Sequence, residues 1–335
     1  MLTPRTPHDL LFLASFILVP ATLLMVTRSG LAERMVLAGS SITAIEQTIS
    51  DDWEVSGGRI TEAQKALNAR RASIAAIAAT LKGRMTGAAA FIGTVETAGT
   101  GKNASVKRIY GYETDTAKPL ASITKLMTAL VALEQTGHDQ ITISPVATAT
   151  EGDGQIIEGE TWSKSDLIQM ALLGSSNDAS EALAEAYGRE DFIVLMNETA
   201  LKYNLMSMKF YNPTGLDIDT EIAGAVGSAA DVANLAAYVM TNYPFVFAIT
   251  SETNHTFTST AGRTITLNNT NPLNRELPGL FFSKTGFTDI AGGNLVVMFD
   301  TAPGKPYVAV TLGSTFDGRF SDIGAMNAAV VANPI

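Results

Sequence analysis

The sequence contains no cysteine, and this absence excludes several classes of protein at once. A chain of 335 residues without cysteine has no disulfide framework, no thiol nucleophile, no Cys-ligated zinc and no lipid on an N-terminal cysteine. Histidine is scarce too: the three histidines, His8, His138 and His255, lie far apart and form no His-Glu-x-x-His motif. The sequence therefore offers too few suitably placed histidines for a histidine-based metal site or a Ser-His-Asp triad. We expect neither a metal nor a cofactor.

Basic residues are also fewer than acidic ones. The chain has 23 Lys and Arg against 33 Asp and Glu, a net charge of -10, which repels phosphate backbones and excludes nucleic acid as an expected partner. Hydrophobic residues make up 46% and charged residues 17%, which indicates a folded body rather than a disordered chain or a multi-span membrane protein. The length allows two domains or one large domain with appendages.

One long apolar run is present, from Leu10 to Val26, and Arg5 precedes it. The run reaches the lower limit of length for a bilayer-spanning helix, while Gly30-Leu31-Ala32 is similar to a signal-peptide cleavage site. Residues 1–28 are therefore a signal anchor or a cleaved signal peptide, and the length favours the anchor. Both alternatives export the rest, so we expect an extracytoplasmic protein, on the periplasmic or cell-wall face, anchored to the cytoplasmic membrane by its N-terminal segment.

Residues 29–85 have the pattern of a helical stalk or linker. Ile42, Ile45 and Ile49 are spaced as on one helical face. A second helix is expected to start at Thr61, to end at Lys82-Gly83 and to carry one apolar stripe: Leu67, Ile74, Ile77 and Leu81. The helix could act as a spacer or its stripe as a self-association surface; alternatively, the stripe packs on the globular domain. The pattern leaves both alternatives open.

Residues 86–335 read as strands, then helices, then strands. The predicted hairpins are 88–97 with 105–113 and 256–267; the predicted helices are 122–134, several over 163–243 and 323–331; the late strands are 281–287, 294–299 and 307–313. This order predicts an α+β fold, in which helices flank an antiparallel sheet and a helical subdomain, about residues 140–255, is inserted between its halves.

A serine and a lysine three residues apart, Ser122 and Lys125, stand at the start of the first of these helices. This spacing places an amine beside a hydroxyl on one helical face. Serine alone is a poor nucleophile, and a neighbouring lysine can take its proton only when that lysine is neutral, which requires burial and a second nearby cation. The motif is weak by itself, because a helix-capping serine with a surface lysine has the same spacing.

Two further motifs strengthen the prediction. Ser175-Ser176-Asn177 follows Gly174 in a loop between helices, and Lys284-Thr285-Gly286 ends an apolar strand. The order Ser-x-x-Lys, Ser-x-Asn, Lys-Thr-Gly is that of penicillin-recognising serine enzymes. Each motif residue taken singly has an ordinary structural interpretation: Asn177 as a helix cap, Lys284 as a surface charge and Thr285 as a strand former.

From about residue 86 onward, the chain resembles the low-molecular-mass penicillin-binding proteins, the serine-type D-Ala-D-Ala carboxypeptidases and endopeptidases. The segments that carry the resemblance are Lys118-Pro119-Leu120-Ala121-Ser122-Ile123-Thr124-Lys125-Leu126-Met127-Thr128-Ala129, Gly174-Ser175-Ser176-Asn177-Asp178-Ala179, Asn212-Pro213-Thr214-Gly215-Leu216 and Lys284-Thr285-Gly286-Phe287-Thr288. The resemblance implies the fold shared by DD-peptidases and serine β-lactamases, peptidoglycan stem peptides as substrates and β-lactams as covalent inhibitors.

The resemblance also implies roles for individual residues. Ser122 would be the acylated nucleophile, Lys125 its general base, and Ser175 the relay of protons to the leaving amine. Asn177 would bridge Lys125 and a substrate carbonyl, and Lys284 with Thr285 would bind the terminal carboxylate. The backbone N–H groups of Ser122 and Phe287 would form the oxyanion hole, and Gly286 would let the backbones approach closely.

The remaining features concern alternatives. Asn212-Pro213-Thr214-Gly215 has the preferences of a type I turn and is expected to be structural. Few residues follow the last predicted strand, so we expect no C-terminal β-rich domain and membrane attachment only at the N-terminus. The absence of Glu-x-x-Leu-Asn between Asn177 and Lys284 disfavours a serine β-lactamase. A DD-endopeptidase acting on cross-linked muropeptides and a non-catalytic, membrane-tethered peptidoglycan-binding protein remain as alternatives to a carboxypeptidase.

Overall fold

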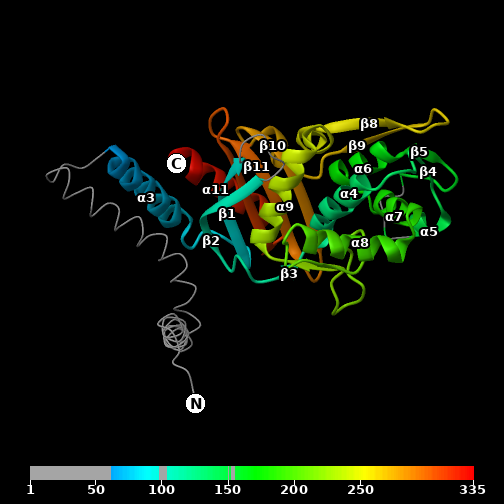
Figure 1. The fold of residues 1–335 in the computed structure, drawn as a ribbon, viewed down its shortest axis with the longest axis horizontal. Coiled ribbons are helices and arrows are strands. Elements are labelled where there is room, and N and C mark those ends of the chain that lie inside the picture. The colour runs from blue at the N-terminus through cyan, green and yellow to red at the C-terminus, as the bar shows by residue number, and fades with distance from the viewer. Residues whose placement is uncertain (1–61, 98–103, 150, 152–154) are drawn as a thin grey trace, which may run out of the picture. The chain divides into compact units, whose positions relative to one another are not determined.

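A computed structural model describes residues 62–97, 104–149, 151 and 155–335 (Figure 1). The predicted membrane segment 1–28 and the first predicted helix of the stalk lie outside the described residues. The chain divides into two units between Arg71 and Ala72, and residues 72–335 carry the fold described below. Within the described ranges, no single helix is long and apolar enough to cross a membrane; one bent helix pair, Ala229–Asn242 with Pro244–Ser251, meets the criteria of length and composition together.

Five antiparallel strands form the central sheet, in the order β10-β11-β12-β1-β2. Their bounds are β1 Ala89–Thr97, β2 Ala104–Tyr112, β10 Leu280–Thr288, β11 Gly292–Asp300 and β12 Pro306–Ser314. The predicted N-terminal hairpin and the three predicted C-terminal strands are therefore confirmed. Because β1 pairs with β12, strands from both ends of this part of the chain join in one sheet, and β10 forms one of its edges.

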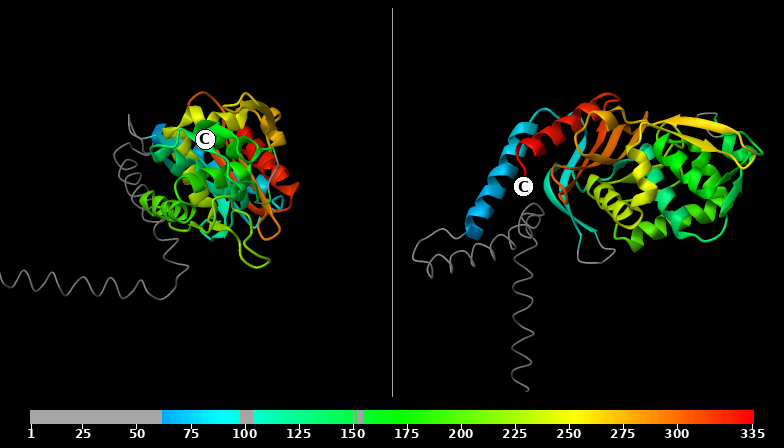
Figure 2. Two further views of the ribbon diagram at one scale, coloured as in Figure 1. Left: turned by 90° about the vertical axis from the view of Figure 1, so that its right-hand side faces the viewer. Right: turned by 90° about the horizontal axis from the view of Figure 1, so that it is seen from above.

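Side chains of the sheet alternate between two apolar layers, as the two-residue period of a strand requires. On β1, Phe91 packs in the cluster that holds Leu235 of α9 (Ala229–Asn242), whereas its neighbour Ile92 packs in the cluster that holds Met326 of α11 (Gly318–Ala332). Figure 2 shows α11 on one side of the sheet and the helical part of the molecule on the other. The α+β prediction is confirmed in this arrangement.

The helices between β2 and β10 form a layer that shares one apolar core with a face of the central sheet. They are α4 Lys125–Glu134, α5 Pro145–Ala149, α6 Lys164–Leu173, α7 Asn177–Ala186, α8 Arg189–Lys202, α9 and α10 Pro244–Phe247, with the 3-10 turns η1 Ala121–Thr124, η2 Ala248–Ser251 and η3 Pro272–Arg275. The large side chains of Leu130, Trp162 and Phe192 are fully buried there. Helices α5 to α10 lie within the range of about 140–255 predicted for the helical subdomain, whereas α4 precedes that range.

Three small sheets connect these elements. They are β3 Lys118–Pro119 with β7 Ala225–Gly227 and β6 Lys209–Phe210; β4 Gln140–Thr142 with β5 Thr161–Ser163; and the hairpin β8 Asn254–Thr258 with β9 Thr264–Asn268. The hairpin confirms the strand pair predicted around Gly262, which has a φ of 87°, in the region that favours glycine. The pairing of β3 with β7 holds the chain just before Ser122, which matters for the site.

Of the two helices α3 (Glu62–Leu81) and α11, only α11 begins several residues away from its predicted start. Helix α3 follows the predicted bounds closely, and Ile77 and Leu81 are fully buried in the apolar layer that contains Met326. For Ile77 and Leu81, this burial favours the alternative in which the stripe packs on the globular part. Helix α11 begins at Gly318 rather than at the predicted Ile323. Its first turn lacks the apolar period on which the prediction rested. A hydrogen bond from Gly318 N to Thr315 Oγ1 at 2.9 Å stabilises this turn.

Candidate active site

Two of the three sequence motifs, and the turn Asn212–Gly215, meet around the side-chain nitrogen of Lys125. Its Nζ donates to Ser122 Oγ at 2.7 Å, to Asn177 Oδ1 at 2.7 Å and to the carbonyl oxygen of Thr214 at 2.9 Å. The side chain is fully buried in the apolar start of α4. The structure therefore brings an amine and a hydroxyl into direct contact in a site shielded from water, as the Ser-x-x-Lys motif predicts.

The local backbone explains the contact between Ser122 and Lys125. The predicted single helix from Ser122 is wrong at its start: residues 121–124 form the 3-10 turn η1, and the α-helix begins at Lys125. In a 3-10 turn, side chains three residues apart eclipse each other, so the hydroxyl and the amine face one another. Ala121 has a φ of 46°, a strained value for a residue with a side chain, and Leu120 N donates to Ala225 O at 2.9 Å, which pins the turn to β7.

A second lysine, Lys284 on β10, is also buried. Its Nζ donates to Ser175 Oγ at 2.8 Å and to Thr285 O at 2.9 Å, and the residue is only 1% exposed. Burial, and then the nearby positive charges of Lys125 and Arg319, hold the pKa of Lys284 well below its usual value. The surface-charge interpretation of Lys284 is therefore wrong.

Ser175 and Asn177 come from the connection between α6 and α7. Ser175 has a φ of 60°, in the left-handed region, and such strain is concentrated at functional sites. Ser176 accepts a hydrogen bond from Ala179 N at 3.1 Å and caps α7, which leaves Asn177 as the first helical residue. Asn177 Nδ2 donates to the carbonyl oxygen of Glu151, so the amide is held from both ends.

Strand β10 runs close to the turn that carries Ser122. A side chain on Gly286 would place its Cβ 2.9 Å from Leu120 O and 3.1 Å from Ser122 N, so only glycine fits without displacing backbone. The predicted oxyanion donors, the N–H groups of Ser122 and Phe287, thus belong to neighbouring backbone segments. Thr285, 5% exposed, has its Oγ1 2.6 Å from Thr270 Oγ1, on the segment before β10.

The turn Asn212–Gly215, which we expected to be only structural, contributes the carbonyl oxygen of Thr214 to Lys125. Asn212 Oδ1 accepts from Gly215 N at 2.7 Å and shapes the turn. Gly215 has a φ of 81°, and a Cβ there would lie 1.9 Å from Ala121 O. The glycine in the fourth position indicated the turn, but no local signal showed that it contacts the site.

Sequence reasoning missed two further buried polar residues. Asn294 on β11 donates from Nδ2 to Pro119 O at 2.9 Å and accepts from Gly313 N at 2.8 Å, which ties the segment before Ser122 to the sheet. Arg319 on α11 donates from Nη1 to Gly286 O at 2.7 Å and is 5% exposed. Burial lowers its pKa. Asn294 follows the Lys-Thr-Gly motif on the next strand, where it pairs with Gly286, and Arg319 lies on the last helix. Neither residue belongs to a motif, so motif spacing alone does not reveal them.

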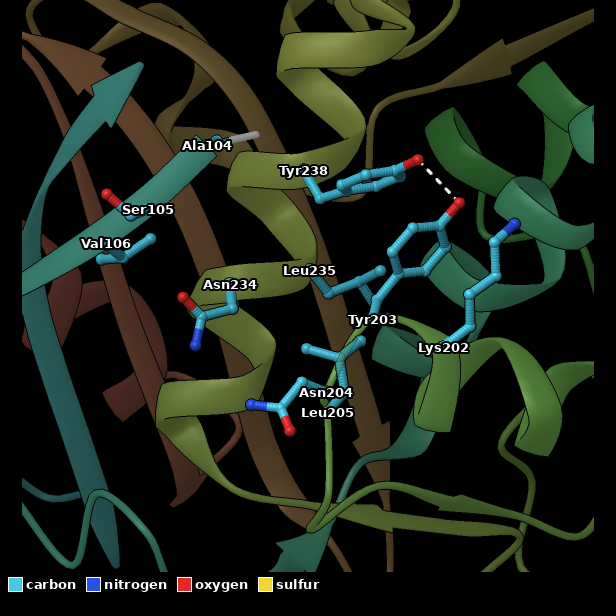
Figure 3. A pocket seen from close by; sticks show the side chains of 10 residues that line it. All are labelled: Ala104, Ser105, Val106, Lys202, Tyr203, Asn204, Leu205, Asn234, Leu235 and Tyr238. Carbon is cyan, nitrogen blue, oxygen red and sulfur yellow. Dashed lines mark hydrogen bonds between the residues drawn. The ribbon is translucent and has the colours of Figure 1, made fainter. Parts of the chain in front are cut away.

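Two cavities differ in their relation to these residues. One of about 590 Å³ adjoins the end of β10, lined by Phe287 and Thr288 and by a loop in which Asp217 accepts hydrogen bonds from Thr288 Oγ1 and Ile290 N. The other, of about 440 Å³, lies between β2 and the helical layer and contains none of the motif residues (Figure 3). There Tyr238 donates to the Tyr203 hydroxyl at 2.7 Å. The second cavity is separate from the candidate site.

Comparison with known proteins identifies the family. Residues 101–315 match the family model described as D-alanyl-D-alanine carboxypeptidase. The chain belongs to the D-alanyl-D-alanine carboxypeptidase family. The motif-based resemblance is thereby confirmed, and the matched range contains all of the site residues predicted from the sequence.

Curated relatives of this family member include both kinds of peptidase. The chain is 32% identical over 215 residues to a D-alanyl-D-alanine endopeptidase of Escherichia coli, covering 62% of this chain and 67% of that protein. It is 33% identical over 228 residues to the D-alanyl-D-alanine carboxypeptidase DacA of Escherichia coli, covering 61% of this chain and 53% of that protein. The chain therefore spans between half and two thirds of these relatives.

Solved structures show the same fold. A penicillin-binding protein from Listeria monocytogenes, in an ampicillin-bound form, superimposes with a TM-score of 0.62 at 28% identity, covering 73% of this chain and 97% of that one. A Streptomyces DD-transpeptidase superimposes with a TM-score of 0.64 at 25% identity, covering 74% and 98%. This family member thus has the DD-transpeptidase-like α+β fold.

Proposed function

We propose that this protein is a serine DD-peptidase that cleaves the D-Ala-D-Ala end of peptidoglycan stem peptides through an acyl-enzyme, and that penicillin acylates the same serine. One observation carries the proposal: Ser122 Oγ lies 2.7 Å from the buried Lys125 Nζ, beside a second buried lysine whose pKa is lowered. The family membership and the penicillin-binding relatives support the same chemistry.

Acylation needs a neutral amine in the pair of lysines. Bringing two ammonium groups into one buried site is costly, and the nearby charge of Lys125 adds to burial in lowering the pKa of Lys284. A neutral Lys125 then accepts the proton of Ser122 as Oγ attacks the carbonyl carbon of the penultimate D-alanine. The N–H groups of Ser122 and Phe287 stabilise the resulting oxyanion.

Collapse of the tetrahedral intermediate breaks the C–N bond. Ser175, which accepts from Lys284 at 2.8 Å, delivers a proton to the departing amine, and D-alanine leaves. Water then attacks the ester carbonyl, and cleavage of the C–O bond returns the hydroxyl of Ser122 and releases the shortened peptide as a carboxylic acid. Asn177 holds the acyl-side amide while it holds Lys125.

The choice between carboxypeptidase and endopeptidase concerns the leaving group. Lys284 and Thr285 are neighbours on β10, where a bound terminal carboxylate would favour the ammonium form of Lys284 and accept a hydrogen bond from the Thr285 hydroxyl. This match places carboxypeptidase activity slightly ahead. The endopeptidase alternative rests on the 32% identical relative with that name.

Competition between two substrates tests this choice. The full chain is offered a monomeric pentapeptide ending in D-Ala-D-Ala and a cross-linked muropeptide dimer. We expect D-alanine release from the pentapeptide at the higher kcat/KM. Preferential cleavage of the dimer, with little D-alanine released, would reverse the assignment to endopeptidase while leaving the chemistry of Ser122 in place.

We further propose that the protein acts outside the cytoplasmic membrane, tethered by residues 1–28. The apolar run Leu10–Val26 after Arg5 and the peptidoglycan substrate of the proposed reaction support this location. Fractionation of cells producing the full chain should recover it with membranes and leave it digestible by protease added to spheroplasts. Recovery in the protease-protected soluble fraction would contradict the tether and the export.

A further inference from the structure

The buried Arg319 lies directly behind the strand of the Lys-Thr-Gly motif. Its Nη1 donates to the carbonyl oxygen of Gly286 at 2.7 Å. The guanidinium carbon lies 4.4 Å from the ring centre of Phe316 and 4.7 Å from that of Phe320. Aromatic rings surround the guanidinium, the residue is only 5% exposed, and its buried Nε has no hydrogen-bond partner among the described residues.

The hydrogen bond to Gly286 reaches the predicted oxyanion donor through a single peptide group. The C=O of Gly286 and the N–H of Phe287 belong to the same planar peptide unit, and in a trans peptide they point in opposite directions. A cationic donor on the carbonyl fixes the plane of this unit. It also draws electron density from the N–H, which becomes a stronger donor, as in any chain of hydrogen bonds.

The hydrogen bond from Arg319 to Gly286 matters because the Gly286–Phe287 peptide unit lies next to the nucleophile. A Cβ on Gly286 would lie 3.1 Å from Ser122 N, so the unit lies against the turn that carries the nucleophile. Burying an arginine on a backbone carbonyl is costly, and burial lowers the pKa of Arg319. Within the described residues Arg319 forms no salt bridge; the charge of Asp317 acts on it and opposes the lowering of its pKa by burial.

We propose that Arg319 is a positioning residue that orients and polarises the Gly286–Phe287 peptide, so that the N–H of Phe287 stabilises the oxyanion formed on Ser122 attack. The inference rests on the proposed acyl-enzyme function. It assigns Arg319 to the acyl carbonyl, whereas Lys284 and Thr285 are assigned to the terminal carboxylate of the leaving group.

Two substrates that differ only in the leaving group separate these roles. One is an acyl-D-Ala-D-Ala peptide, and the other is an acyl-D-alanine thioester whose leaving group has no carboxylate. Removing an oxyanion donor outright costs about 10²–10³ in kcat, so a residue that acts through the donor is expected to cost about tenfold. In the full chain, Arg319→Gln should lower the acylation rate about tenfold on both substrates and leave KM within about twofold.

The conservative variant and a matched control sharpen the result. Arg319→Lys keeps a cation and should recover part of the lost rate on both substrates. Thr285→Val should instead weaken the peptide reaction more than the thioester reaction. A peptide boronic acid, which forms a tetrahedral adduct on the serine, should lose affinity for Arg319→Gln by the same factor as the acylation rate.

Three outcomes would overturn the proposal. A loss confined to the peptide substrate and expressed in KM would assign Arg319 to the carboxylate, and an unchanged rate on both substrates would make it a packing residue. Equal rates for Arg319→Lys and Arg319→Gln, with a lowered melting temperature in both, would also exclude polarisation. Failure of the proposed function is distinguishable, because the unaltered protein would then form no acyl-enzyme with either substrate.

Discussion

Two buried charged groups in this molecule, Asp322 and Lys284, have opposite surroundings. Asp322 on α11 is fully buried and accepts hydrogen bonds from five groups, namely Thr86 N, Thr86 Oγ1, Gly87 N, Thr311 Oγ1 and Ser314 Oγ, at 2.8–3.1 Å. Lys284 is as deeply buried, but it donates to two neutral oxygens, and its pKa is lowered by Lys125 and Arg319 in addition to burial.

The difference separates a structural charge from a functional one. The donors around Asp322 stabilise the carboxylate and tie the segment before β1 to β12 and to α11. The surroundings of Lys284 disfavour its ammonium form, and an arrangement that raises the energy of a charge without a structural gain is typical of catalytic sites. We therefore expect Asp322 to control stability and Lys284 to control activity.

Replacing Lys284 with methionine should give the largest separation of activity from stability. Lys284→Met removes the amine that donates to Ser175 and should lower the rate of penicillin acylation about 10²-fold or more. Because methionine fills similar space without a desolvation cost, the melting temperature should be equal to or above that of the unaltered protein. Stopped-flow acylation and calorimetry measure the two effects. A large fall in melting temperature would show that Lys284 stabilises the fold.

Replacing Asp322 should have the reverse effect. Asp322→Asn presents an amide to donors that the carboxylate accepted, and we expect the free energy of unfolding to fall by about 3 kcal/mol. Acylation per folded molecule should stay within about twofold. Glu190→Gln is the control, because Glu190 has a side chain that is 86% exposed and its loss should change stability by less than about 0.5 kcal/mol. Denaturant unfolding of all three proteins checks the prediction, and equal stability of the two variants would contradict it.

The pH dependence of stability gives a smaller effect with a defined sign. Since the pKa of Lys284 is lowered in the folded protein, the unfolded chain binds the lysine proton at pH values where the folded protein does not. The contribution of Lys284 to stability therefore rises with pH between the lowered pKa and the usual 10.5, by at most about 1.4 kcal/mol for each pH unit. The stability advantage of Lys284→Met should be largest at low pH and should shrink across that interval. An advantage that grows with pH would contradict the lowered pKa.

Short-range signals were enough to predict the sheet and the motif residues. Alternating apolar residues and turn glycines marked both hairpins and the last three strands, and each motif residue lies in the cluster expected for it. The 3-10 geometry of residues 121–124 was missed, because 3-10 and α-helical turns share the same apolar residues. Its consequence, the contact of Ser122 with Lys125, was nevertheless predicted, since residues three apart meet in both kinds of helix.

Long-range contacts could not be predicted. Thr214 contributes a backbone carbonyl, which any residue has, and Asn294 and Arg319 act across 175 and 33 positions of sequence, respectively. Arg319 also stands outside the apolar period of its helix, so the pattern placed the start of α11 after it. A single sequence shows which residue types can do chemistry, whereas the backbone groups that hold them are set by tertiary packing.

Mass spectrometry of the penicillin adduct tests the central claim most directly. The full chain and Ser122→Ala are each incubated with penicillin, and the intact mass and the modified peptide are determined. We expect one adduct on the unaltered protein, located on Ser122, and none on the variant. An adduct of equal stoichiometry on Ser122→Ala, or no adduct on the unaltered protein, would contradict the assignment of Ser122 as the nucleophile.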